Sequence, residues 1–176
     1  MNQFASPSNQ ESISWRTWLA VVALGMSAFA IVTTELAPIG LLSPLATEFG
    51  QTEGRAGLIV TAYAWIAALA ALLSAMFLGR VPRKPLLVGL MLVLTVSCTI
   101  AAFSAQFSML LGARMIGALA HGAFWAMIGS IGAQLVPARQ VGLATSIIFG
   151  GVSVASVLGV PLANLLAQLD GWRTAF

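Results

Sequence analysis

Five long apolar stretches constrain what this chain can fold into. They lie near residues 17–42, 55–79, 85–104, 107–136 and 141–168, and short polar loops separate them. About 20 apolar residues, each rising about 1.5 Å in a helix, cross a hydrocarbon core of about 30 Å. A backbone in lipid must satisfy its own hydrogen bonds, and the stretches lack the alternating pattern of barrel strands. The sequence therefore predicts an all-α membrane protein that crosses the bilayer several times.

The composition leaves too little polar surface for a water-soluble globule. Charged residues make up 7% of the chain, against about 25% in an ordinary soluble domain. Hydrophobic residues make up 59%, and the mean hydropathy is +0.96. The net charge of +3 does not indicate a nucleic-acid partner, because the cations are spread along the short loops. The lipid bilayer is the expected surrounding, and no nucleic acid is expected to bind.

The basic loop residues predict the orientation of the chain. A cytoplasmic N-terminus places most of them inside, as the positive-inside rule prefers; they are Arg16, Arg80, Arg83, Lys84 and Arg139. Residues 1–14, rich in Ser, Asn and Gln, then form a disordered cytoplasmic tail. The alternative is a signal peptide cleaved near Ala28–Ala30. The apolar run continues well past these residues and the leader carries one arginine, which favours a membrane span.

The residues that build most catalytic and metal sites are scarce. Cys98 is the only cysteine and His121 the only histidine, so the chain can form neither an intrachain disulfide nor the usual zinc sites. It carries no nucleophile elbow, phosphate loop or dinucleotide fingerprint. We therefore expect neither an enzyme nor a cofactor. A membrane enzyme, the alternative class, would need a cluster of polar catalytic groups that this sequence does not contain.

Glu35 lies inside the first apolar stretch. An ionisable side chain at membrane depth costs about 2.5–3.5 kcal/mol on insertion scales, so it is retained where it lines a cavity, finds a partner or carries protons. Counted along the predicted helices, Glu35, Tyr63 and Arg114 reach a similar depth, roughly 10 Å from the outer surface. Glu35 and Arg114 can therefore pair, and His121, seven residues after Arg114, lies on nearly the same face. A titratable stripe inside a bundle predicts a proton-coupled transporter.

Each of these residues also has a purely structural interpretation. Glu35 and Arg114 could form a static ion pair that fixes the register of two helices. His121 could be a hydrogen-bonded packing residue. Tyr63 and Trp65 could be interfacial or packing aromatics instead of substrate contacts.

Small residues recur every four positions in three of the stretches. The sets are Gly151, Ala155, Gly159 and Ala163; Ala67, Ala71, Ala75 and Gly79; and Ala118, Gly122, Ala126 and Ser130. Such stripes let helix backbones approach closely, which indicates a packed bundle. Pro38 and Pro161 lack the N–H that would reach the carbonyl four residues earlier, so we expect a kink or break at both.

Four segments together resemble one known family. They are TTELAPIGLL at 33–42, TAYAWIAALAAL at 61–72, ARMIGALAHGAFWA at 113–126 and VLGVPLANLLAQLDGWRTAF at 157–176. In combination they resemble the N-terminal half of a major facilitator superfamily efflux transporter, within the drug:proton antiporters and their bacterial sugar efflux group. The resemblance implies that residues 15–176 form a truncated N-terminal transmembrane domain, a bundle of about five helices plus the start of a sixth.

The resemblance also implies roles for individual residues. It assigns proton coupling to Glu35 in the first apolar stretch and to Arg114 in the fourth. In the fifth apolar stretch, Gly151, Gly159 and Pro161 resemble the antiporter motif of the family, which governs closing of the cavity. The loop between helices 2 and 3 keeps its basic residues Arg80, Arg83 and Lys84. It departs from the family pattern at Gly79 and Pro82, so its charge relay is not expected in the usual form. The possible substrate cavity is assigned to Tyr63, Trp65, His121 and Trp125.

The final GWRTAF, residues 171–176, resembles the outer start of the sixth helix. The chain is therefore expected to be a fragment that lacks its C-terminal half and is inactive alone. With that half it is predicted to exchange protons for sugars or small amphiphilic compounds across the bacterial inner membrane, with the proton gradient as driving force. The alternative is a non-transporting membrane bundle, either a regulatory partner or a degenerate remnant.

Overall fold

A computed structural model describes residues 14–176 of the chain, apart from the side chain of Arg80. The predicted disorder of residues 1–13 concerns a segment outside this description. Ser14, which the sequence analysis placed in the tail, caps the first helix, because its Oγ accepts a hydrogen bond from the backbone N–H of Arg16 at 3.3 Å.

Helices account for all regular structure of the described residues. Five are long and apolar enough to cross a membrane, as predicted. They are α1 (Trp15–Leu36), α4 (Leu58–Phe77), α5 (Arg83–Ala102), α6 (Phe107–Leu135) and α7 (Val141–Asp170). Short helices fill the connections: η1 (Ala37–Leu41), α2 (Leu42–Glu48), α3 (Glu53–Ala56), η2 (Leu78–Arg80), η3 (Ala138–Gln140) and η4 (Trp172–Ala175). The predicted all-α class is confirmed.

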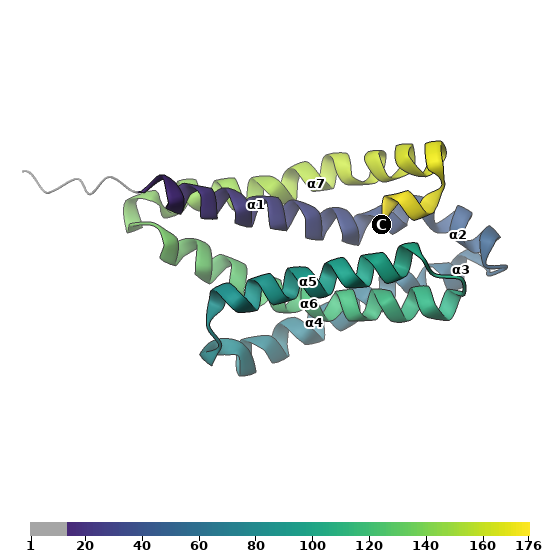
Figure 1. The fold of residues 1–176 in the computed structure, drawn as a ribbon, viewed down its shortest axis with the longest axis horizontal. Helices are drawn as coiled ribbons and strands as arrows, with labels where there is room; N and C mark the ends of the chain where they lie inside the picture. The colour runs from purple at the N-terminus through teal and green to yellow at the C-terminus, as the bar shows by residue number, and fades with distance from the viewer. Residues whose placement is uncertain (1–13) are drawn as a thin grey trace, which may run out of the picture.

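The long helices alternate in direction, which gives the bundle two ends (Figure 1). The start of α1, the α4–α5 turn and the α6–α7 turn lie at one end. We call it the basic end, because five cations belong to these segments: Arg16, Arg80, Arg83, Lys84 and Arg139. The α1–α4 and α5–α6 connections and residues 171–176 lie at the opposite end.

The helices form two groups (Figure 1). α1 packs along α7, and α6 packs against both α4 and α5. Apolar side chains join the two groups, with Ile31 of α1, Phe124 of α6 and Ile148 of α7 in one buried cluster. A second cluster lies at the opposite end around Trp172. Polar residues that sit between the groups are therefore shielded from lipid.

Small residues bring the helices of each group into backbone contact. A Cβ at Gly151 of α7 would lie 2.1 Å from the carbonyl oxygen of Gly25 in α1. A Cβ at Gly122 of α6 would lie 2.0 Å from the carbonyl oxygen of Ala67 in α4. These contacts confirm the packing predicted from the small-residue stripes. The stripes pack over only part of their length, because some members are exposed: Ala75, Gly79 and Ser130.

The two prolines affect their helices differently. α1 ends at Leu36, and the 3-10 turn η1 follows with Pro38 in its first residues. The break predicted there is confirmed. α7 continues as a helix through Pro161 to Asp170. Pro161 therefore does not end its helix.

Candidate proton and substrate site

The helix break at Pro38 leaves a backbone acceptor free in the interior. Pro38 has no N–H, so the carbonyl of Thr34, four residues earlier, has no α-helical donor. Arg114 of α6 replaces the missing donor, because its Nη1 donates to the Thr34 carbonyl oxygen at 2.9 Å. The break in α1 thus anchors a buried cation from another helix directly beside Glu35.

Arg114 is only 2% exposed, and aromatic rings face its charge. Its guanidinium carbon lies 4.1 Å from the centre of the Tyr63 ring and 5.7 Å from the centre of the Phe176 ring. Both distances lie within the range of cation–π attraction. Its Nε and Nη2 have no hydrogen-bond partner among the described residues. Buried donors without a partner are rare, so these two groups can receive a ligand acceptor or a mobile carboxylate.

Tyr63 connects Arg114 to two further polar groups. Its hydroxyl lies 3.1 Å from Nδ1 of His121, and Nε2 of His121 lies 3.6 Å from Oε2 of Glu35. Neutral His121 satisfies both neighbours in one tautomer, in which Nδ1 accepts from Tyr63 and the Nε2 proton points to the carboxylate. Tyr63 and His121 are buried, whereas the Glu35 side chain is 33% exposed. One accessible carboxylate therefore ends a buried polar chain.

The shared depth predicted for Glu35, Tyr63 and Arg114 is confirmed by these contacts. The expected direct ion pair between Glu35 and Arg114 is absent from residues 14–176, because the carboxylate lies within ion-pair distance of His121 instead. Arg114 is held away by the Thr34 carbonyl and the Tyr63 ring. Counting residues along the predicted helices thus predicted that the charged residues lie at the same height, but not which groups contact one another.

The predicted aromatic residues of the cavity divide into two groups. Trp65 does not join the site: it follows Tyr63 by two residues, about 200° around α4, and is 70% exposed. Trp125 does join it, with its ring centre 6.2 Å from that of His121. Phe149 of α7 continues the series at 6.1 Å from Trp125. Phe149 was not predicted, because nothing distinguishes one phenylalanine from the others in an apolar stretch.

The residues assigned to the antiporter motif lie along α7. Gly151 touches the backbone of α1, and a Cβ at Gly159 would lie 3.4 Å from Cα of Thr33. Pro161 lies on an exposed side of the helix. The two glycines thus form the contact between α1 and α7, and their role in gating stays a prediction.

The basic loop residues border a groove of about 740 Å³ between α1, α5 and α6. Arg83 and Lys84 lie at its basic end, and Nη1 of Arg83 donates to Oε1 of Gln134 in α6. This contact ties the start of α5 to the end of α6. The side chain of Arg80 lies outside the description, and the expectation that this loop lacks the usual charge relay stays a prediction.

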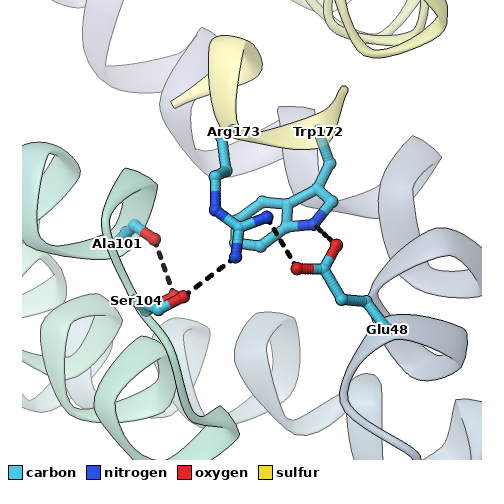
Figure 2. A network of polar contacts seen from close by, with 5 residues as sticks. All are labelled: Glu48, Ala101, Ser104, Trp172 and Arg173. Atoms are coloured by element: carbon cyan, nitrogen blue, oxygen red, sulfur yellow. Dashed lines mark hydrogen bonds and ion pairs between the residues drawn. The ribbon is translucent and has the colours of Figure 1, made fainter. Parts of the chain in front are cut away.

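A second polar cluster, the C-terminal clamp, consists of Glu48, Ser104, Trp172 and Arg173 (Figure 2). Glu48 Oε1 accepts from Arg173 Nη1 at 2.6 Å, and Oε2 accepts from the indole Nε1 of Trp172 at 2.5 Å. Arg173 Nη2 donates to the Ser104 carbonyl at 3.2 Å. The clamp joins α2, the α5–α6 connection and η4. The clamp was not predicted, because Glu48 and Arg173 are 125 residues apart and carry no local signal.

We expect Trp172→Phe to destabilise the chain more than Arg173→Gln. Both partners of the Glu48–Arg173 pair are exposed, and such pairs contribute about 0–1 kcal/mol. Trp172 is buried, and phenylalanine would remove its hydrogen bond to a carboxylate and shrink a packed ring, a loss of about 1–2 kcal/mol. Thermal unfolding in detergent, followed by circular dichroism, tests this order. A lower midpoint for Arg173→Gln than for Trp172→Phe would contradict it.

The whole described region is similar to known proteins. The family model of the Major Facilitator Superfamily matches residues 12–176. Purine ribonucleoside efflux pumps NepI from Shigella dysenteriae serotype 1, Shigella sonnei and Escherichia coli are each 37% identical to the chain over 177 residues. Each match covers 100% of this chain and 45% of the pump. The chain thus spans less than half the length of these curated relatives.

Proposed function

The chain belongs to the major facilitator superfamily, and from this premise we propose that it forms the N-terminal half of a proton-coupled efflux transporter for purine ribonucleosides. The observation that carries the proposal is Glu35, a partly exposed carboxylate that meets the buried His121–Tyr63 pair at membrane depth. Ionisable groups in this position are costly and serve ion or substrate pathways. The likeness to the purine ribonucleoside efflux pumps supports the direction of transport.

In the proposed cycle, Glu35 binds a proton from the outside and releases it to the cytoplasm. The ionised carboxylate of Glu35 attracts the Nε2 proton of His121, and protonation of Glu35 removes this attraction. The free Nε and Nη2 of Arg114 then receive in turn the ionised carboxylate or an acceptor atom of the substrate. Because one cluster serves both ligands, proton and substrate compete, which is the requirement for exchange.

The substrate class narrows the earlier expectation of a sugar or a small amphiphile. The relatives are named for purine ribonucleosides, which combine a ribose with an aromatic base. The polar groups around Glu35 suit hydroxyl groups, and the aromatic rings around Trp125 suit a flat base. The polar groups that suit a ribose and the aromatic rings that suit a base therefore lie close together in the structure.

The remaining assignments belong to the same proposal. The N-terminus and the basic end face the cytoplasm of a bacterial inner membrane. Rocking of this half against a C-terminal half would alternate access to the site. Gly151 and Gly159 would hold α1 and α7 together during this movement, and the exposed Pro161 would face the moving contact. The basic loop with Arg80, Arg83 and Lys84 would lie at the cytoplasmic end of this contact.

The proposal is tested by export in a two-part transporter. This chain is expressed together with the remainder of the Escherichia coli pump, and tritiated guanosine uptake is measured in inverted membrane vesicles. We expect uptake that requires an acidic vesicle interior and stops with a protonophore, and none with the chain alone. If the two parts copurify yet guanosine is not taken up, the proposed substrate class is wrong. Uptake of a labelled hexose instead would favour a sugar exporter.

A further inference from the structure

Four aromatic side chains from three helices lie in a continuous row. We call it the aromatic row: Tyr63 of α4, His121 and Trp125 of α6, and Phe149 of α7. Successive ring centres are 5.3, 6.2 and 6.1 Å apart. Only its first half, Tyr63 and His121, takes part in the polar contacts with Glu35. The proton chemistry proposed above leaves Trp125 and Phe149 unused.

Exposure increases along the row. Tyr63 and His121 are buried, Trp125 is half-buried, and Phe149 is 41% exposed. Trp125 and Phe149 are inclined to each other by 46° with their ring centres 6.1 Å apart, so the two rings do not stack face to face. Phe124, which is fully buried, meets Trp125 edge-on at 6.4 Å and supports it from the side of the core. The row therefore ends in an open, firmly supported aromatic surface.

Trp125 lies on the side of α6 that carries the polar groups, and Phe149 of α7 is in ring contact with it. Trp125 follows His121 by four residues, so both project from the same side of α6. That side meets the Glu35 carboxylate, and charged groups within membrane spans face the interior of a bundle or a water-filled cavity. His121 thus lies between Glu35 and Trp125, in contact with both.

We infer that Trp125 and Phe149 form the surface that binds the base of the exported nucleoside, while Glu35 accepts a hydrogen bond from its ribose. The inference rests on the proposed function and assigns the specificity of the same site. Aromatic side chains stack on any nucleic-acid base because every base has a π-face. A carboxylate accepts from ribose hydroxyls. The pair discriminates a nucleoside from a free sugar, which offers no base to stack.

The test compares aromatic and aliphatic replacements in the two-part transporter. Phe149→Leu is expected to raise the guanosine concentration at half-maximal uptake about tenfold, the loss of a base–aromatic contact, while the maximal rate changes less than about twofold. Phe149→Tyr is expected to restore the original value, because it keeps the ring. Trp125→Leu and Trp125→Phe should repeat this pattern. Phe103→Leu is the matched control, because Phe103 is 77% exposed at the end of α5 and should leave uptake unchanged.

Competition separates base binding from a general effect on structure. Unlabelled guanine should inhibit uptake less well in Phe149→Leu, whereas inhibition by ribose should be unaltered. If Phe149→Leu keeps the original half-saturation and guanine inhibition, the inference is wrong while the proposed function stands. If the unmodified two-part transporter takes up no guanosine, the proposed function fails first, and the inference fails with it.

Discussion

Glu35→Gln should abolish proton-driven accumulation of the nucleoside while leaving exchange of labelled for unlabelled substrate. Glutamine keeps the size and hydrogen-bonding capacity of the side chain but can neither bind nor release a proton. In the structure Glu35 is the partly exposed end of the chain that runs through His121 to Tyr63. We expect the accumulation ratio in inverted vesicles of the two-part transporter to fall at least about tenfold, equivalent to about 1.4 kcal/mol of lost coupling.

Glu53→Gln serves as the matched control. Glu53 is an exposed carboxylate at the start of the short helix α3, before α4 begins. Its replacement should leave both accumulation and exchange unchanged. Undiminished accumulation in Glu35→Gln would exclude Glu35 as the proton site. Loss of both accumulation and exchange would point to substrate binding alone.

The second large effect is expected from Gly151→Ala. The new methyl group would lie 2.1 Å from the carbonyl oxygen and 2.9 Å from the carbonyl carbon of Gly25. Backbone atoms cannot move aside as a side chain can, so α1 and α7 would have to separate along their main contact. We expect a loss of about 3 kcal/mol or more, at or above the upper end of the usual cost of overpacking. The apparent melting temperature of the chain in detergent measures it.

Two other glycines of α7 provide the controls for this substitution. A Cβ at Gly150 meets no atom within 4 Å, so Gly150→Ala should be neutral or slightly stabilising in a helix. Gly159→Ala should fall between the two, since its Cβ would meet Thr33 at 3.4 Å. A melting temperature of Gly151→Ala equal to that of Gly150→Ala would contradict the close contact between α1 and α7 at Gly151.

The membrane spans were predictable because their signal is local. Four of the five predicted stretches match α4, α5, α6 and α7 to within a few residues at each end. The first was predicted through residue 42, whereas α1 ends at Leu36 and a 3-10 turn follows. Apolar length is read from a window of about 20 residues. The change from α-helix to 3-10 helix around Pro38 depends on how the turn packs.

The level of the candidate site was also predictable, because rise per residue converts position into depth. This arithmetic brought Glu35, Tyr63 and Arg114 together. It could not decide which groups touch, because partners also depend on the rotation of each helix about its axis. The same limit explains Trp65, which has the right depth but faces the other side of α4.

By itself the sequence determined the solvent, the number of spans, the helix break at Pro38 and the family. All of these follow from composition, from periodicity or from motifs within single segments. Only the tertiary structure decided that Arg114 binds the Thr34 carbonyl, that His121 lies beside Glu35, and that Glu48 is held by Trp172 and Arg173. These contacts join residues 80, 86 and about 125 positions apart. Their geometry depends on the packing of whole helices, which no local stretch of sequence encodes.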